Sequence, residues 1–237
     1  MELHSRRLLA ALAASLTLLL AGATVAEAKV TPLTGTTTFT PSAQATQFLA
    51  NHGVTVAPTG AATAEDGGFV FPIAGGFANG RLNSGLLAHK GGLEFTKGDR
   101  SAVVQRFVAV RIRGRGAVLL AQIPGLRGGC GHLRAALAHF ALEHPRTAKR
   151  VRRVARHLPG SRALLRAVRD YCDGGRVIVL AHLTNLGREP RYKGALLTAD
   201  LKLSGQAARL INKVAGERAV SAGAPLGTAE SSVTVAD

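Results

Sequence analysis

The chain has 237 residues, 46% of them hydrophobic, and its 30 Lys and Arg outnumber 14 Asp and Glu, giving a formal net charge of +16. This hydrophobic content is enough for a folded core, but 4% aromatic residues and no Trp exclude a core built on stacked rings. The positive charge favours anionic partners, such as cell-envelope polymers, acidic lipids or extracellular nucleic acid.

Residues 1–28 have the organisation of a bacterial export signal. Arg6 and Arg7 precede an apolar run over residues 8–20, and Ala26 and Ala28 are the small residues that a signal peptidase reads. We predict cleavage near Lys29 and a secreted or cell-envelope protein, with no transmembrane segment left after cleavage and no intracellular nucleic acid as partner. An uncleaved anchor is the weaker alternative, because a membrane span needs about 20 apolar residues.

The chain from residue 31 to residue 126 is predicted to be mostly strand. Thr36–Thr40 is followed by a polar cap at Ser42 and a short helix that contains Phe48 and ends near Gly53. The alternation of side chains between two faces, which is typical of a strand, is clearest around Phe107 and Ala109, which share one face. That strand is expected at residues 103–113, and the others in this part of the chain at 69–71, 82–89, 93–96 and 117–123.

Residues 127–172 differ in character, because they contain 11 Lys or Arg and only two acidic residues. Their apolar spacing predicts three short helices, interrupted at Pro145 and again at Pro159. Five bases fall within eight residues without a neutralising acid, which predicts a polyanion-binding face formed by Lys149, Arg150, Arg152, Arg153 and Arg156. A solvated basic face, favoured by a GC-rich genome, is the alternative.

The two cysteines, Cys130 and Cys172, lie at the two ends of this basic segment. In an exported chain they are predicted to form one disulfide, which would close the segment at its neck. The rival interpretation is a catalytic thiol at Cys130, next to His132 and at an expected helix start, where the pKa of a thiol falls.

The last part of the chain returns to strands at residues 177–182 and 196–203, and it ends with a strand at 226–235 that carries a glycine bulge at Gly227. Between the last two strands Ser204 caps a helix that Gly216 ends. Together these elements predict a mainly β, antiparallel β-sandwich-like domain with two short helices. That domain comprises residues 29–126 and 173–237, with residues 127–172 as a helical insertion.

The sequence lacks the motifs of common enzymes and metal sites. It contains no H-E-x-x-H, C-x-x-C, P-loop or G-x-S-x-G motif, and its acidic residues are scattered rather than paired. We therefore predict a binding protein that is not an enzyme and has no metal site formed by the protein alone.

Two glycine-rich stretches carry a more specific signal. Phe69-Val70-Phe71-Pro72-Ile73-Ala74-Gly75-Gly76 precedes the hairpin Gly85-Leu86-Leu87-Ala88-His89-Lys90-Gly91-Gly92-Leu93-Glu94-Phe95. This pattern resembles the HtaA-type, haem-transport-associated domain of actinobacterial exported proteins. The resemblance implies an all-β, non-enzymatic module, some members of which bind haem through Tyr and His. It makes haem, or another small ligand, a candidate partner and His89, His52 and Tyr192 candidate ligand-binding residues.

Overall fold

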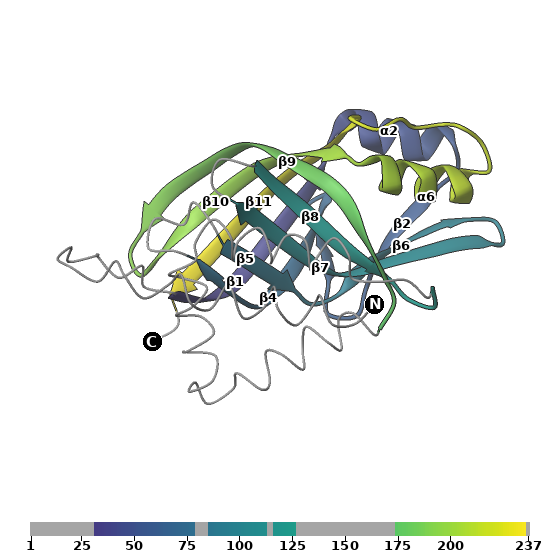
Figure 1. Ribbon diagram of the computed structural model, residues 1–237. Helices are drawn as coiled ribbons and strands as arrows, with labels where there is room; N and C mark the ends of the chain where they lie inside the picture. The colour runs from purple at the N-terminus through teal and green to yellow at the C-terminus, as the bar shows by residue number, and fades with distance from the viewer. Residues whose placement is uncertain (1–30, 79–84, 113–115, 127–173, 236–237) are drawn as a thin grey trace, which may run out of the picture.

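The computed structural model describes residues 31–78, 85–112, 116–126 and 174–235 (Figure 1). In chain order its elements are β1 (Thr31–Pro41), α2 (Ala43–Asn51), β2 (Thr55–Thr59), β3 (Thr63–Glu65), β4 (Gly68–Ala78), β5 (Gly85–His89), β6 (Gly92–Lys97), β7 (Arg100–Ile112), β8 (Gly116–Ile123), β9 (Arg176–Arg191), β10 (Gly194–Leu203), α6 (Gly205–Ala215) and β11 (Pro225–Val235). None of the described helices is long and apolar enough to cross a membrane.

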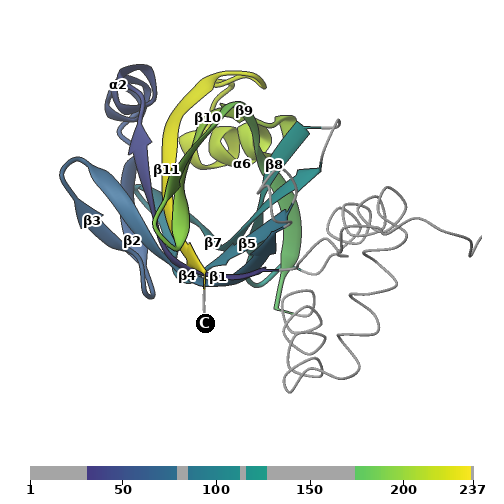
Figure 2. The ribbon, with the colours of Figure 1, turned by 90° about the vertical axis from the view of Figure 1, so that its left-hand side faces the viewer.

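Eight antiparallel strands close into a barrel in the order β7-β5-β4-β1-β11-β10-β9-β8, and β8 pairs with β7 to complete the ring. Figure 2 shows this ring of strands, with α6 visible within its outline. The prediction of a mainly β, antiparallel domain is confirmed, but the sandwich is wrong. The sheet does not split into two layers, because β7 pairs along one edge with β5 and along the other with β8.

Strand β7 is long enough to pair with two different strands, β6 and β5, along the same edge. Its first half pairs with β6, from Arg100 to Gln105, and its second half pairs with β5 as far as Arg111. A register shift between Gln105 and Val108 and a positive φ of 51° at Arg106 mark the change of partner. Such bulges bend a strand and increase its twist, which a closing sheet requires. Strand β6, with β2 beside it, therefore extends beyond the barrel.

Two sides of the outer surface of the barrel differ in polarity: a polar wall formed by β1 and β11, and an apolar one formed by β5, β7, β8 and β9. On β1 and β11 the outward side chains are exposed and polar, as at Thr34, Thr36, Glu230, Ser232 and Thr234. On β5, β7, β8 and β9 they form a cluster that we call the apolar wall. Its members are Leu86, Ala88, Val108, Val110, Val118, Leu120, Val177 and Val179.

Both predicted helices are present and capped as expected. The Ser42 hydroxyl accepts a hydrogen bond from the Ala45 backbone N–H at 3.1 Å, and Ser204 does the same for Ala207. Helix α6 ends at Gly216 in the left-handed conformation, with φ of 80°. Because α6 buries five residues and α2 none, α6 is fixed more firmly on the barrel.

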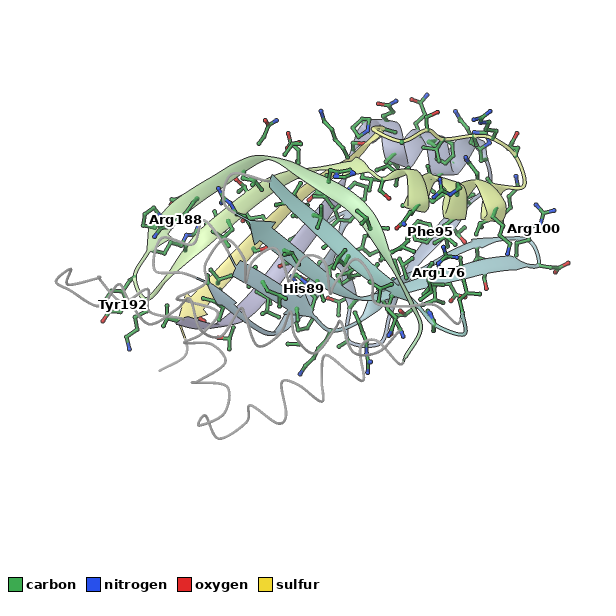
Figure 3. All side chains as sticks on the ribbon, in the orientation of Figure 1. His89, Phe95, Arg100, Arg176, Arg188 and Tyr192 are labelled. Atoms are coloured by element: carbon green, nitrogen blue, oxygen red, sulfur yellow. The ribbon has the colours of Figure 1, made fainter. Side chains whose placement is uncertain are left out.

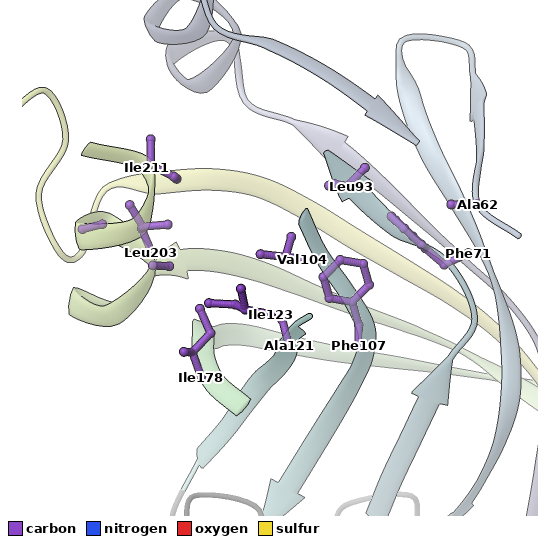
Figure 4. Close-up of a cluster of buried hydrophobic side chains, with 12 residues drawn as sticks. Ala62, Phe71, Leu93, Val104, Phe107, Ala121, Ile123, Ile178, Leu203 and Ile211 are labelled. Atoms are coloured by element: carbon purple, nitrogen blue, oxygen red, sulfur yellow. The ribbon is translucent and has the colours of Figure 1, made fainter. Parts of the chain in front are cut away.

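The main core cluster lies where α6 meets the barrel (Figure 4). It joins Ile211 of α6 to Ile178 and Leu203 of the strands below the helix and continues to the aromatic pair Phe71 and Phe107. The apolar face of α6, with Ala207, Ile211 and Val214 buried, therefore covers one end of the barrel.

Several predictions fall on residues outside the described ranges. These are the export signal at 1–28, the helices within 127–172, the Cys130–Cys172 disulfide and its catalytic-thiol alternative, and the polyanion-binding set Lys149, Arg150, Arg152, Arg153 and Arg156. They remain predictions.

Candidate functional site

A cavity of about 740 Å³ occupies the interior of the barrel and extends toward α2. Its lining is almost entirely apolar, and three small residues leave its middle open: Ala199 and Ala229 on the neighbouring strands β10 and β11, and Ala109 on β7. Phe48 and Leu49 of α2 line the cavity at the helix end. A volume in this range, with few polar groups, is typical of sites for small organic ligands.

One polar group lies within this apolar interior. His89, Thr37 and Ser231 come from β5, β1 and β11, and all three side chains are buried. The Thr37 hydroxyl lies 2.8 Å from His89 Nε2 and 2.8 Å from the Ser231 hydroxyl, and His89 Nδ1 lies 3.1 Å from the Phe107 carbonyl oxygen. Strand alternation explains the placement, because Thr37 pairs with Ser231 across β1 and β11 with both facing inward.

These distances define where the protons are. A carbonyl oxygen can only accept, so His89 Nδ1 carries the proton and donates it to Phe107. His89 Nε2 then accepts from the Thr37 hydroxyl, whose oxygen accepts from Ser231. The three side chains form one ordered hydrogen-bond chain that ends on an imidazole lone pair.

Burial makes this imidazole a weak base. Desolvation lowers the pKa of His89 from its ordinary value of 6.5 to about 4, although the hydrogen bond to Phe107 acts in the opposite direction. His89 is therefore neutral at pH 7. A neutral imidazole is the form that can bind a metal centre.

The lowered pKa of His89 makes the barrel sensitive to acid. Between pH 6.5 and about 4 the unfolded chain binds a proton at His89 and the folded chain does not, so stability falls as the pH falls. We expect this group to cost about 3 kcal/mol of unfolding free energy across that window. The variant His89→Gln should show a shallower dependence in urea titrations at a series of pH values, whereas His182→Gln, at an exposed residue, should follow the wild type. Equal slopes for wild type and His89→Gln would contradict the assignment.

The other two predicted ligand residues lie elsewhere. His52 follows α2, where its Nδ1 lies 2.8 Å from Glu217 Oε1, and this hydrogen bond lowers the pKa of the Glu217 carboxyl. Tyr192 lies in the turn between β9 and β10 and is 92% exposed, far from His89 in Figure 3. Of the three candidates, only His89 lines the cavity.

Sequence reasoning did not identify Thr37 and Ser231. A Thr or Ser within a strand is ordinary, and nothing local distinguishes Thr37 from its exposed neighbours Thr36 and Thr34. In residues 31–78, 85–112, 116–126 and 174–235 the structure contains no group of three or more His, Cys, Asp or Glu that could hold a metal ion.

The fold has counterparts among solved structures. The chain matches the C-terminal domain of HtaA from Corynebacterium glutamicum with a TM-score of 0.53 and 12% identity, over 87% of this chain and 98% of that domain. It also aligns with the haem-binding protein HtaB of the same organism, with a TM-score of 0.43 and 11% identity, over 87% and 94%.

At 12% identity, the likeness to HtaA establishes a shared fold, and it confirms the HtaA-type architecture that the glycine-rich motifs implied. HtaB is named for binding haem, and neither protein is named as an enzyme. No protein-family model matches the chain, and no curated protein does.

Proposed function

We propose that this protein is an exported binding protein that holds a small apolar ligand inside its barrel, with haem as the first candidate. The observation that carries the proposal is the cavity of about 740 Å³, whose apolar lining surrounds the imidazole of His89. The fold shared with HtaA, and the resemblance of the glycine-rich stretches to the haem-transport-associated domain, direct the choice toward haem. Export rests on the signal pattern of residues 1–28.

The lining has the chemistry that haem requires. Haem iron is held in proteins by His, Cys, Met or Tyr, and among the described residues that line the cavity His89 is the one side chain of these types. Arg111 also lines the cavity and offers a cation to a carboxylate. His89 would provide the nitrogen for iron, the apolar strands would exclude water from the macrocycle, and Arg111 would hold a propionate.

Binding of iron at His89 Nε2 would require the hydrogen bond that this nitrogen now accepts to be broken. The Thr37 hydroxyl oxygen lies 2.8 Å from that nitrogen, where iron would bind, so the Thr37 side chain would have to rotate about χ1 and give up this hydrogen bond. The Ser231 hydroxyl, which donates to Thr37 at 2.8 Å, would then need another acceptor. In this proposal the Phe107 carbonyl holds the imidazole through His89 Nδ1, and Thr37 and Ser231 do not contact the iron.

The test is a haemin titration followed by Soret absorbance, on wild type, His89→Ala and His89→Gln. We expect a saturable Soret shift for wild type and at least about tenfold weaker binding for both variants, since tenfold corresponds to about 1.4 kcal/mol. Because Gln can keep the hydrogen bonds to Phe107 and Thr37, His89→Gln separates lost ligation from lost folding. His182→Ala, at an exposed histidine, is the matched control.

An unchanged Soret band in wild type, or an equal shift in His89→Gln, would overturn the haem assignment. The alternative function is binding of anionic envelope polymers through the basic residues of segment 127–172, as the local charge suggests. Such binding weakens steeply with salt because it depends on screened charges, whereas a ligand buried in an apolar cavity responds little.

A further inference from the structure

The apolar wall is a continuous surface on the outside of the barrel. Strand register aligns Ala88, Val108, Leu120 and Val179 in one row across β5, β7, β8 and β9. Val108 precedes Ala109, which lines the cavity, so alternation turns Val108 outward, and none of the four residues of this row borders the cavity. An antiparallel sheet that faces water on one side normally has polar residues there, as the wall formed by β1 and β11 does.

The side chains of this wall are nevertheless shielded from solvent. Val108 is 5% exposed, Leu120 1% and Val177 3%. Within the described part of the chain, the cluster consists of side chains from these four strands alone. Helix α6 packs on the main core cluster, at the end of the barrel, and α2 contacts β11. The cover must therefore come from outside the described elements.

We propose that the apolar wall is the docking surface for segment 127–172 of this same chain. The segment begins shortly after Ile123, the last residue of β8, and ends shortly before Arg176, the first residue of β9. Both β8 and β9 belong to the wall, so the segment is tethered to it at both ends. A tethered segment docks at a high effective concentration, which favours it over a separate partner.

The segment has the composition and length that the wall requires. Its sequence carries apolar stripes at helical spacing, among them Leu133, Leu137 and Phe140, and later Val151 and Val154. Four strands spaced about 4.8 Å apart span about 14 Å between the outer strand axes. A helix is about 10 Å wide and ten residues of it are about 15 Å long, so one or two short helices would cover the wall.

Limited proteolysis of the full chain tests this docking, because trypsin cleaves after Lys and Arg and the segment contains 11 of them. We expect cuts within 127–172, located by mass spectrometry, to be at least about tenfold slower in wild type than in Leu120→Glu or Val108→Glu. Ser232→Glu places the same charge on the polar wall, where Ser232 is exposed, and should cleave like wild type. Val118→Glu, at a partly exposed position of the apolar wall, provides a milder variant if the others fail to fold by circular dichroism.

Other results would overturn the proposal. Equal cleavage rates in wild type and in folded wall variants, or wild-type cleavage as fast as that of a free peptide of residues 127–172, would show that the segment is not docked. If protection disappears in a chain that begins at Lys29, the cover is the N-terminal segment. A dimer that Val108→Glu dissociates in sedimentation experiments, without a change in cleavage, would assign the wall to a second copy.

Discussion

Replacing Phe107 with alanine is expected to lower the free energy of unfolding by about 3–5 kcal/mol, a large part of the stability of an ordinary domain. Phe107 is 5% exposed, and its ring meets that of Phe71 edge to face, with centroids 5.1 Å apart and an interplanar angle of 82°. The ring also borders the cavity. Its loss would enlarge a space that the neighbouring strands cannot close, so the structure would recover little of the lost contact.

Urea or guanidinium unfolding of the purified variant measures this effect. Tyr192→Ala is the matched control, because it removes an aromatic ring that is 92% exposed and should change stability by less than about 0.5 kcal/mol. A loss below about 1 kcal/mol for Phe107→Ala would mean that Phe107 does not join the barrel interior to the core beneath α6.

Replacing Ala229 with tryptophan is expected to block the cavity and to weaken ligand binding by at least about tenfold. Ala229 faces the interior beside Ala199 of β10 and Phe39 of β1, two residues along β11 from Ser231. An indole there would occupy the space that the small residues leave, and it would deny a ligand access to His89. Binding of haemin by Soret absorbance, and of the apolar dye 1-anilinonaphthalene-8-sulfonate by fluorescence, provides the measurement.

Thr228→Trp is the control for this experiment. Thr228 precedes Ala229, is exposed, and carries its side chain on the other face of the same strand. It should leave both ligands bound as in wild type. If Ala229→Trp binds haemin like wild type while remaining folded, the ligand does not enter the middle of the barrel and the proposed site is wrong.

The local elements of this fold could be predicted because their signals are local. The serine caps at Ser42 and Ser204, the left-handed Gly216 and the alternation around Phe107 each depend on residues a few positions apart. The short strand β3 was missed because Thr63–Glu65 is exposed throughout and shows no alternation of polarity.

Closure of the sheet could not be predicted in the same way. Alternation tells which side chains share a face, and a sandwich and a barrel impose the same alternation on a strand. What distinguishes them here is the double pairing of β7 and the register shift after Gln105, and these depend on partners distant in sequence. The resemblance to a known domain supplied the family fold, but not the way in which its sheet closes.

The candidate site was predicted in part for the same reason. His89 could be named from its hairpin, but its partner Thr37 is 52 residues away and Ser231 is a further 194 residues from Thr37. Only the pairing of β1 with β11, and of β4 with both β1 and β5, brings these side chains into one interior. His52 and Tyr192 were proposed because His and Tyr are common haem ligands, but residue type does not specify whether a side chain points into the barrel.

The pairing of β1 with β11 also constrains the order of events in folding of the barrel. Leu33 of β1 lies opposite Val235 of β11, so the ring cannot close until β11 has been synthesised. Contacts between residues so far apart in sequence are slow to form, because closing a long loop costs conformational entropy before the contact contributes any stabilising free energy. The barrel would thus remain open until β11 has been synthesised, and its closure would be a late event in folding.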